Sequence, residues 1–146
     1  MRLSKHFTLQ ELIKSSTAER RGIKNVPGRA EIDSLTLVCE NILEPVREHY
    51  GVPMAPSSGY RCLELNQAIG SGDTSQHVKG QAVDFEIPGI PNRDLANWIM
   101  ENVDYDQLIL EFYKKEDPNS GWVHCSYVNK ENRKKALCFD GKNWEK

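Results

Sequence analysis

The sequence has no apolar run long enough to cross a bilayer or to form the core of a signal peptide. Its N-terminal stretch, MRLSKHFTLQELIKSS, is polar, and no later segment approaches about 18 consecutive apolar residues. We therefore expect no membrane partner and synthesis in a cytoplasm without a signal peptide. A substrate in the cell wall would then be reached only when the protein is released.

The chain also lacks a strong charge of either sign. It has 19 Lys and Arg residues against 21 Asp and Glu residues, and its formal net charge is −2. Nothing in this balance favours a nucleic-acid partner, and no acidic tract indicates disorder. Because there is neither a linker nor an internal repeat, we expect residues 1–146 to form a single domain, and a monomer.

Cysteine is scarce, and its four occurrences are far apart. None of them forms a CxxC pair, which argues against a zinc knuckle built from thiolates. We expect all four to be buried, reduced thiols that act as small hydrophobic residues. They are Cys39, Cys62, Cys125 and Cys138.

The first half of the chain carries helix signals. Thr8 and Glu11 have the spacing of a capping box, and Phe7 and Leu12 stand where a hydrophobic staple would lie. The spacing of apolar residues predicts a long helix over residues 29–50, kinked at its proline.

Two shorter helices are expected further along the chain. One is CLELNQAI at residues 62–69, and the other is PNRDLANWIMEN at residues 91–102, with Asn92 as its N-cap. Both precede or interrupt the segments that read as strands.

Strand patterns are concentrated in the second half. The alternating segments are QAVDFEI (81–87), QLILEF (107–112) and WVHCSY (122–127), and LCFDGKNWE (137–145) reads as a terminal hairpin. Helices followed by clustered strands predict an α+β fold with a mainly antiparallel sheet flanked by helices.

Two histidines and an aspartate stand out near these strands. His77 precedes the first predicted strand, Asp84 lies within it, and His124 lies in a later strand that could share its face. Two imidazoles and a carboxylate are a frequent ligand set for catalytic zinc, which keeps a fourth position for water. Gly80 would let the loop fold back toward one ion. The residue types alone leave a chance arrangement open.

Three segments resemble a known family. SGYRCLELNQAIG, SQHVKGQAVDF and GWVHCSY together look like the zinc D-alanyl-D-alanine peptidases of the M15 family, in particular the free-standing domains encoded by phages and prophages. The resemblance runs from about His6 to about Tyr127. The pattern SxHxxGxAxD is specific when SGYR precedes it and WxHxS follows. The hedgehog signalling domain has a related fold and ligand set.

The resemblance implies a zinc site and a substrate contact. His77, Asp84 and His124 would bind Zn²⁺, and Arg61 would hold the substrate near its scissile carbonyl, as a guanidinium is suited to do. The alternative for Arg61 is a surface ion pair.

Three further residues are expected at the substrate groove. Ser75 belongs to the matched pattern, and Tyr60 and Trp122 lie within the matched segments SGYR and GWVHCSY. Core packing remains an equal alternative for both aromatic side chains.

The general base is less directly indicated. In several relatives a glutamate stands three residues before the last histidine ligand, but Gly121 occupies that position here. We expect Glu111 to take the role, from a strand beside WVHCSY, and we keep Glu116 and Asp117 as alternatives. Glu86 shares a face with the aspartate ligand but lies further along the strand.

The resemblance implies hydrolysis of an amide in the peptide stems of bacterial peptidoglycan. The enzyme would be a D-Ala-D-Ala carboxypeptidase or a cross-link endopeptidase, and in a phage an endolysin. Zinc would lower the pKa of its water to about 7. The missing glutamate keeps open a non-catalytic, zinc-stabilised module that binds wall peptides, or a structural phage component.

Overall fold

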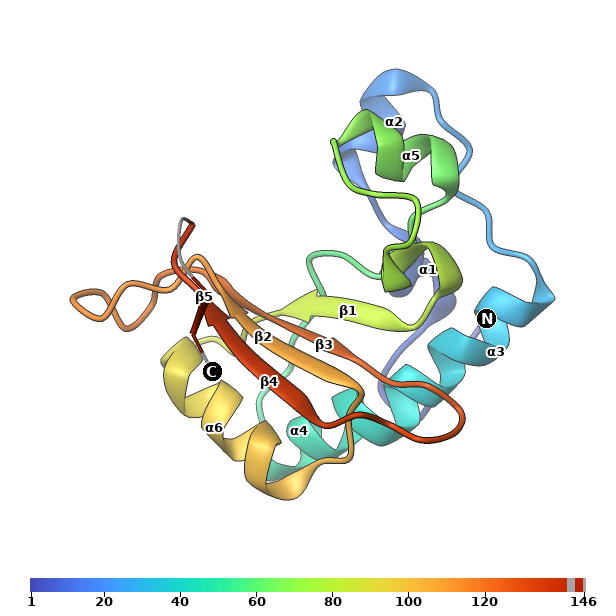
Figure 1. Ribbon diagram of the computed structural model, residues 1–146. Coiled ribbons are helices and arrows are strands. Elements are labelled where there is room, and N and C mark those ends of the chain that lie inside the picture. The colour runs from blue at the N-terminus through green and yellow to red at the C-terminus, as the bar shows by residue number, and fades with distance from the viewer. Residues whose placement is uncertain (142–143, 146) are drawn as a thin grey trace.

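The computed structural model describes residues 1–141 and 144–145. Figure 1 shows helices from the first half of the chain packed around a sheet formed mostly by the second half. The helical elements are α1 (Leu9–Ile13), α2 (Ser16–Arg21), α3 (Arg29–Val38), the π-helix η1 (Cys39–Leu43), α4 (Glu44–Tyr50), α5 (Leu63–Ala68), the 3₁₀-helix η2 (Gln76–Lys79) and α6 (Asn92–Asn102). The strands are β1 (Ala82–Phe85), β2 (Gln107–Glu111), β3 (Trp122–Ser126), β4 (Lys135–Phe139) and β5 (Trp144–Glu145).

The predicted start of α1 is confirmed. Thr8 accepts a hydrogen bond from the Glu11 backbone, and the Glu11 carboxylate accepts one from the Thr8 backbone at 3.0 Å. Phe7 and Leu12 are both buried, as a hydrophobic staple requires. The helix α2 was not predicted, although Ser15 caps it in the ordinary way.

The predicted long helix is continuous, but its distortion lies before the proline. The backbone N–H of Glu44 reaches back five residues to the carbonyl of Cys39, which closes the π-helical turn of η1. Pro45 then follows in the first turn of α4, where the widened turn before it tolerates the missing N–H. A local π-bulge thus accommodates the proline inside one helical segment.

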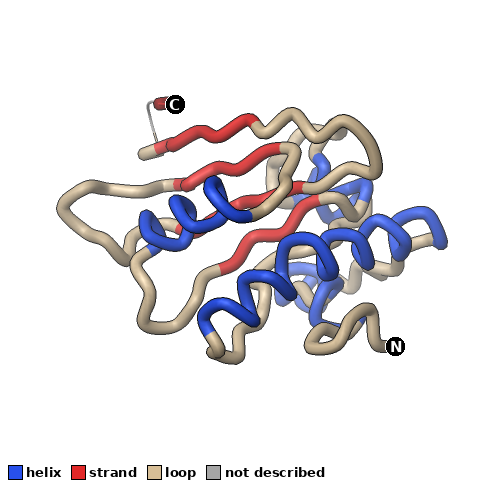
Figure 2. Tube along the Cα trace, turned by 90° about the horizontal axis from the view of Figure 1, so that it is seen from below, coloured by secondary structure: helices blue, strands red, loops and turns tan. Residues whose placement is uncertain are grey.

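The α+β fold with a mainly antiparallel sheet is confirmed. The strand order is β1-β3-β2-β4-β5, and every pair is antiparallel except β2 with β4, which is parallel and was not predicted. Figure 2 shows the strands side by side in this sheet. The terminal hairpin is confirmed by the pairing of Phe139 with Trp144, while positions 142–143 of its turn lie outside the described residues.

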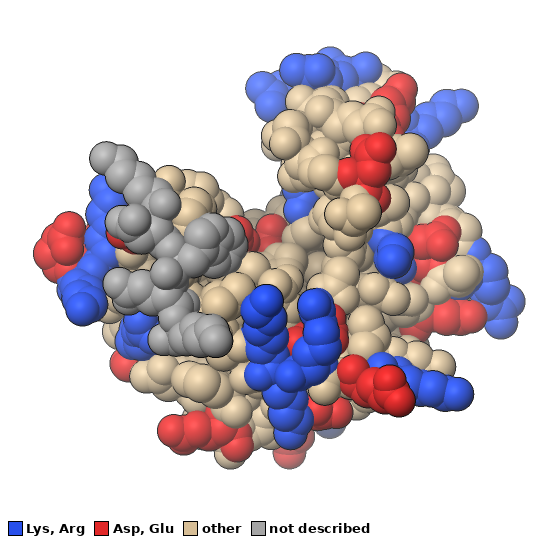
Figure 3. Space-filling view, viewed as in Figure 1, with Lys and Arg blue, Asp and Glu red and all other residues tan. Residues whose placement is uncertain are grey.

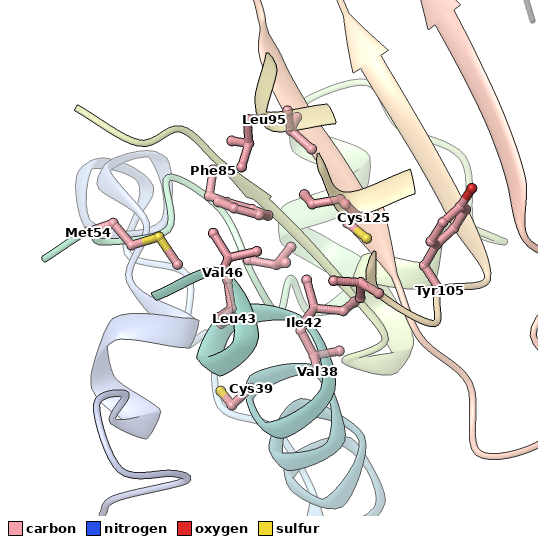
Figure 4. Packing of buried hydrophobic residues seen from close by; sticks show 14 of the residues in the cluster. Val38, Cys39, Ile42, Leu43, Val46, Met54, Phe85, Leu95, Tyr105 and Cys125 are labelled. Carbon is pink, nitrogen blue, oxygen red and sulfur yellow. The ribbon is translucent and has the colours of Figure 1, made fainter. Parts of the chain in front are cut away.

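The core lies on one face of the sheet, under the long helical segment and α6. Val38, Ile42 and Val46 from the helices meet Phe85 and Cys125 from the strands (Figure 4). Because side chains alternate along a strand, the neighbouring residues of β1, β3 and β2 point to the opposite face. That face carries the candidate ligands.

Two expectations need correction. Asn92 is the first residue of α6 rather than its cap; Pro91 is the cap. The buried Asn92 amide instead donates hydrogen bonds to the Glu86 carboxylate and to the Gly121 carbonyl. Of the four free cysteines two are buried as expected, whereas Cys62 and Cys138 are half-buried.

In the described part of the chain, no helix has the length and apolar character that a membrane span needs.

Candidate metal centre

The three predicted ligands come together at the edge of the sheet. Asp84 in β1 lies directly opposite His124 in β3, and His77 enters from η2 just before β1. One ligand atom from each residue lies within 4.8 Å of the others. His77 and Asp84 are 2% and 9% exposed, so the group is shielded from bulk water.

The orientation of His77 leaves its second nitrogen without a proton. Its Nδ1 lies 2.7 Å from the carbonyl oxygen of Gly59, to which only a protonated nitrogen can donate. The neutral ring then has a lone pair on Nε2, which lies 3.4 Å from Oδ2 of Asp84. Nε2 has no hydrogen-bond partner among the described residues. Two electron-rich atoms that face each other in a buried site call for a cation between them.

Two glycines let the chain approach this closely. A Cβ on Gly59 would collide with the carbonyl oxygen of Leu12, and one on Gly80 would collide with that of Glu31. Gly80 also has a left-handed backbone, with φ 72°, and it caps η2 as the chain turns into β1. The turn that was expected to bring His77 back toward the ion is therefore present.

The charges of the three side chains suit a divalent cation. Burial raises the pKa of Asp84, but the hydrogen bond from His124 opposes it, and the two imidazoles beside the carboxylate hold its pKa well below the usual range. Burial lowers the pKa of His77, which favours the neutral ring. His124 donates from Nδ1 to Oδ1 of Asp84 at 2.9 Å. Loss of that one proton would complete a set of two imidazole nitrogens and a carboxylate.

The ligands line a cavity of about 550 Å³. It opens in the hollow between the lobe formed by α2 and α5 and the end of the sheet (Figure 3). Its other lining residues are Arg61, Ile69, Ser71, Gly72, Ser75, Glu111, Phe112 and Trp122.

Glu111 lies where a base would be needed. It pairs with Trp122 across β2 and β3, and its Oε2 accepts a hydrogen bond from the indole N–H at 3.0 Å. The same oxygen lies 4.0 Å from Nδ1 of His124. Burial raises the pKa of Glu111, and the nearby Asp84 raises it further, against the opposite effect of His124 and Arg61. A raised pKa makes this carboxylate a stronger base than an exposed glutamate, as the role of a general base favours.

The alternative bases lie elsewhere. Glu116 and Asp117 are exposed in the loop between β2 and β3 and do not line the cavity. Glu86 accepts a hydrogen bond from Asn92 and lines a different cavity, beside Met54. Of the four acids weighed from the sequence, the structure brings only Glu111 to the ligands.

Arg61 also reaches the site. Its backbone N–H donates to the carbonyl of His77, and its buried Nε has no hydrogen-bond partner among the described residues. Burial lowers the pKa of Arg61, whereas Asp84 and Glu111 raise it. None of the ion pairs among the described residues involves this guanidinium, so Arg61 is not part of a surface ion pair there.

Of the three other residues expected at the substrate groove, two line the cavity and one lies in the core. Trp122 and Ser75 line the cavity, and the Ser75 hydroxyl accepts a hydrogen bond from the backbone of His77, which caps η2. Tyr60 is 8% exposed and packs in the hydrophobic core, away from the cavity lining. Tyr60 therefore takes the alternative of core packing. Its neighbour Gly59 contacts the site instead, through the backbone carbonyl that accepts a hydrogen bond from His77.

Gly121 explains why the glutamate of several relatives cannot stand here. Its φ is 70°, and a Cβ would collide with the carbonyl oxygen of Glu111. The tight approach of β2 to the start of β3 therefore requires glycine at this position. The carboxylate reaches the ligands from the neighbouring strand.

The comparison with protein families decides the relationship. The model for Peptidase M15 matches residues 5–126, which contain the three ligand candidates, Arg61 and Glu111. The chain belongs to the Peptidase M15 family. Comparison with curated protein sequences gives no match. The matched range agrees with the range over which the sequence resembles M15 peptidases, and the chain is accordingly a peptidase with a candidate metal site.

Proposed function

We propose that this M15 peptidase is a zinc enzyme that hydrolyses an amide bond in the peptide stems of bacterial peptidoglycan. The observation that carries the proposal is the unprotonated Nε2 of His77 facing the Asp84 carboxylate in a buried site. Glu111 and Arg61 line the same cavity and supply the other groups that amide hydrolysis needs.

The donor set favours zinc over the common alternatives. Two imidazole nitrogens and one carboxylate suit Zn²⁺, whereas Ca²⁺ and Mg²⁺ prefer sites built entirely from oxygen ligands. Three protein ligands leave a fourth position, as is usual in catalytic zinc sites. When bound, zinc would acidify a water molecule and polarise the scissile carbonyl.

The side chains of the cavity account for the remaining chemistry. Glu111 accepts the proton of the attacking water and returns it to the leaving amine, a role that its raised pKa suits. The indole N–H of Trp122 holds one oxygen of this carboxylate in place. Arg61 donates to the oxygen on which negative charge develops, and one such donor commonly contributes about 3 kcal/mol.

The family membership and the cavity together favour a peptide substrate from the wall. Stem peptides contain a terminal amide bond and, where they are joined, a cross-linking amide bond. Release of a terminal residue identifies a carboxypeptidase, and cleavage of the cross-link identifies an endopeptidase. The resemblance to phage-encoded domains extends the proposal to lysis of a host wall after release of the protein.

The test is digestion of purified peptidoglycan with and without added zinc, followed by mass spectrometry of the products. We expect new amino termini or the loss of a terminal residue only in the presence of zinc. The zinc-loaded Glu111→Gln variant is the matched control, because it keeps the shape of the side chain and removes its charge. Wall binding without any cleavage by the zinc-loaded wild type would instead identify the non-catalytic module.

A further inference from the structure

The orientation of Glu111 depends on where the chain enters β3. The loop over residues 112–121 joins Glu111 at the end of β2 to Trp122 at the start of β3, and it projects beyond the end of the sheet (Figure 1). The indole N–H of Trp122 donates to Oε2 of Glu111 at 3.0 Å. Gly121 packs directly against the Glu111 carbonyl. Whatever holds the end of this loop therefore also sets the direction in which the Glu111 carboxylate points.

Asn92, the first residue of α6, holds the end of this loop through both its backbone and its side chain. Its backbone N–H donates to the carbonyl of Pro118 at 3.1 Å. Its side-chain Nδ2 lies 3.0 Å from the carbonyl oxygen of Gly121 and 3.2 Å from that of Ser120. These hydrogen bonds attach the residues immediately before Trp122 to a helix that packs on the core.

The same amide reaches the end of β1. Nδ2 of Asn92 lies 2.9 Å from Oε1 of Glu86, and a hydrogen bond to a charged acceptor is stronger than one between neutral groups. Asn92 is 1% exposed, so bulk water does not compete for its amide hydrogens. Asn92 thereby joins the segment after β1 to the segment before β3, and these two strands carry Asp84 and His124.

The buried oxygen of Asn92 indicates that the amide is needed for its hydrogens. Its Oδ1 has no hydrogen-bond partner in the part of the chain that the structure describes, and a buried acceptor without a partner destabilises a fold. An apolar side chain would avoid that penalty. An aspartate of the same shape would turn an acceptor toward the Glu86 carboxylate and the carbonyls of residues 120–121. An amide of this size can donate to all of them.

We propose that Asn92 is a positioning residue for Glu111. By holding residues 118–121, its amide fixes the start of β3, so that Trp122 keeps its indole N–H on the Glu111 carboxylate. The inference rests on the proposed function for the role of Glu111 as the base. The contact between Trp122 and Glu111 itself can be measured without turnover, so the two proposals can fail separately.

The main variant is Asn92→Asp, which keeps the shape of the side chain and removes its donors. A carboxylate in the first turn of α6 suits the helix dipole, so fraying of α6 would not explain a loss of activity. Asn97→Asp makes the same change at an exposed position of α6 and is the matched control. Asn92→Asp combined with Glu86→Gln removes the repulsion between two carboxylates without restoring the donors to residues 120–121.

The first measurement is hydrogen exchange of the Trp122 indole N–H, followed by NMR and assigned by the absence of its signal from Trp122→Phe. We expect exchange to be about tenfold faster or more in Asn92→Asp and in the double variant, and unchanged in Asn97→Asp. An unchanged rate in Asn92→Asp would overturn the proposal. A wild-type rate in the double variant would also overturn it, because repulsion from Glu86 would then explain the single variant. If Asn92→Asp does not fold, Asn92→Ala takes its place.

The second measurement is turnover of a soluble stem peptide by zinc-loaded protein. We expect Asn92→Asp to lower kcat about tenfold or more, as misplacement of a catalytic group does, while KM changes less than about twofold and bound zinc stays equal. In a Trp122→Phe background, which already lacks the indole N–H, Asn92→Asp should lower kcat by less than about twofold. A tenfold loss in that background, or a normal kcat in Asn92→Asp itself, would overturn the proposal.

The two measurements separate this proposal from the proposed function. If the wild type cuts no wall peptide, the proposed function fails, and the exchange rate alone decides whether Asn92 positions the pair of Trp122 and Glu111. Faster exchange in Asn92→Asp would then still support the positioning, and an unchanged rate would overturn it.

Discussion

Two aspartates, Asp84 and Asp106, are similarly buried but have different surroundings. Asp84 is 9% exposed and Asp106 is 3% exposed, and neighbouring groups hold the pKa of each below its usual value. Asp106 is surrounded by donors: the guanidinium and backbone N–H of Arg133 and the amide of Gln76. Asp84 instead shares its space with an imidazole lone pair of His77.

The different partners indicate that Asp106 is a structural carboxylate, whereas Asp84 is placed to bind a cation. The chain itself supplies every partner that Asp106 needs, so its cluster is complete when the protein folds. In the Asp84 cluster, Nε2 of His77 is buried and has no hydrogen-bond partner in the part of the chain that the structure describes, an arrangement that becomes favourable when a cation binds. Both clusters therefore share burial and a lowered pKa of the carboxyl, and they differ in whether every group beside the carboxylate donates a hydrogen bond to it.

The largest effect that this comparison predicts is loss of the metal. His77→Ala and His124→Ala should each reduce bound zinc from about one per chain to a small fraction, measured by elemental analysis after dialysis. Loss of the several kcal/mol that a catalytic metal supplies corresponds to a decrease in activity of about a thousandfold or more. His49→Ala is the control, since this exposed histidine stacks on Trp98 far from the ligands. Full zinc occupancy in both ligand variants would contradict the assignment.

The second effect concerns Glu111, the carboxylate of the cavity that is not among the three candidate ligands. Glu111→Gln should keep the zinc and the melting temperature and lose at least about a hundredfold in kcat, the lower end of what a positioned base contributes. Glu116→Gln and Asp117→Asn should change kcat by less than about twofold, because both side chains are exposed in the loop. Near-normal turnover by Glu111→Gln, together with an inactive loop variant, would place the base in the loop.

A smaller effect is expected for Arg61. Because its Nε has no partner among the described residues, Arg61→Ala should leave zinc content intact and lower kcat/KM at least tenfold, which is a loss of about 1.4 kcal/mol or more. Arg61→Lys should recover only part of the loss, since an ammonium lacks the planar fork of the guanidinium. A large decrease in melting temperature without a kinetic effect in folded protein would show that the guanidinium is structural.

Local patterns predicted most of what builds the metal centre. Strand alternation placed Asp84 and His124 on one face, and the glycine of SQHVKG indicated the turn that brings in His77. The same alternation brought Glu111 beside Trp122 once the two strands were paired. These features depend on neighbours in sequence or on a single strand pairing, which periodicity encodes.

Features that depend on distant partners escaped prediction. The parallel pairing of β4 with β2 requires residues 127–134 to pass the start of β2, so that β4 pairs with the far edge of that strand. No local pattern encodes that path. Groove and core stayed equal alternatives for Tyr60, because the motif SGYR does not tell which side chain faces the groove and which faces the core. The Asp106 cluster joins residues 27 positions apart and has no signal in either segment.

The smallest effect on activity should come from the Asp106 cluster, which lies outside the proposed chemistry. Asp106→Asn should lower the free energy of unfolding by about 2 kcal/mol, the contribution expected of hydrogen bonds to a charged group, while kcat changes less than twofold. Asp104→Asn is the matched control: its exposed carboxylate lies 3.8 Å from Lys134, and such surface pairs contribute less than about 1 kcal/mol. Urea denaturation at pH 7 measures both.

The pH dependence of that difference sharpens the contrast. Hydrogen bonds from Arg133 lower the pKa of Asp106 in the folded protein, so folding favours the ionised carboxylate. Its stabilisation is therefore fully present above the ordinary pKa of about 4 and is lost as the pH falls through the folded value. The stability difference between wild type and Asp106→Asn should be constant from pH 7 to about pH 5 and shrink below about pH 4. A difference that persists unchanged at pH 3 would mean that packing, rather than the charge of Asp106, stabilises this end of the sheet.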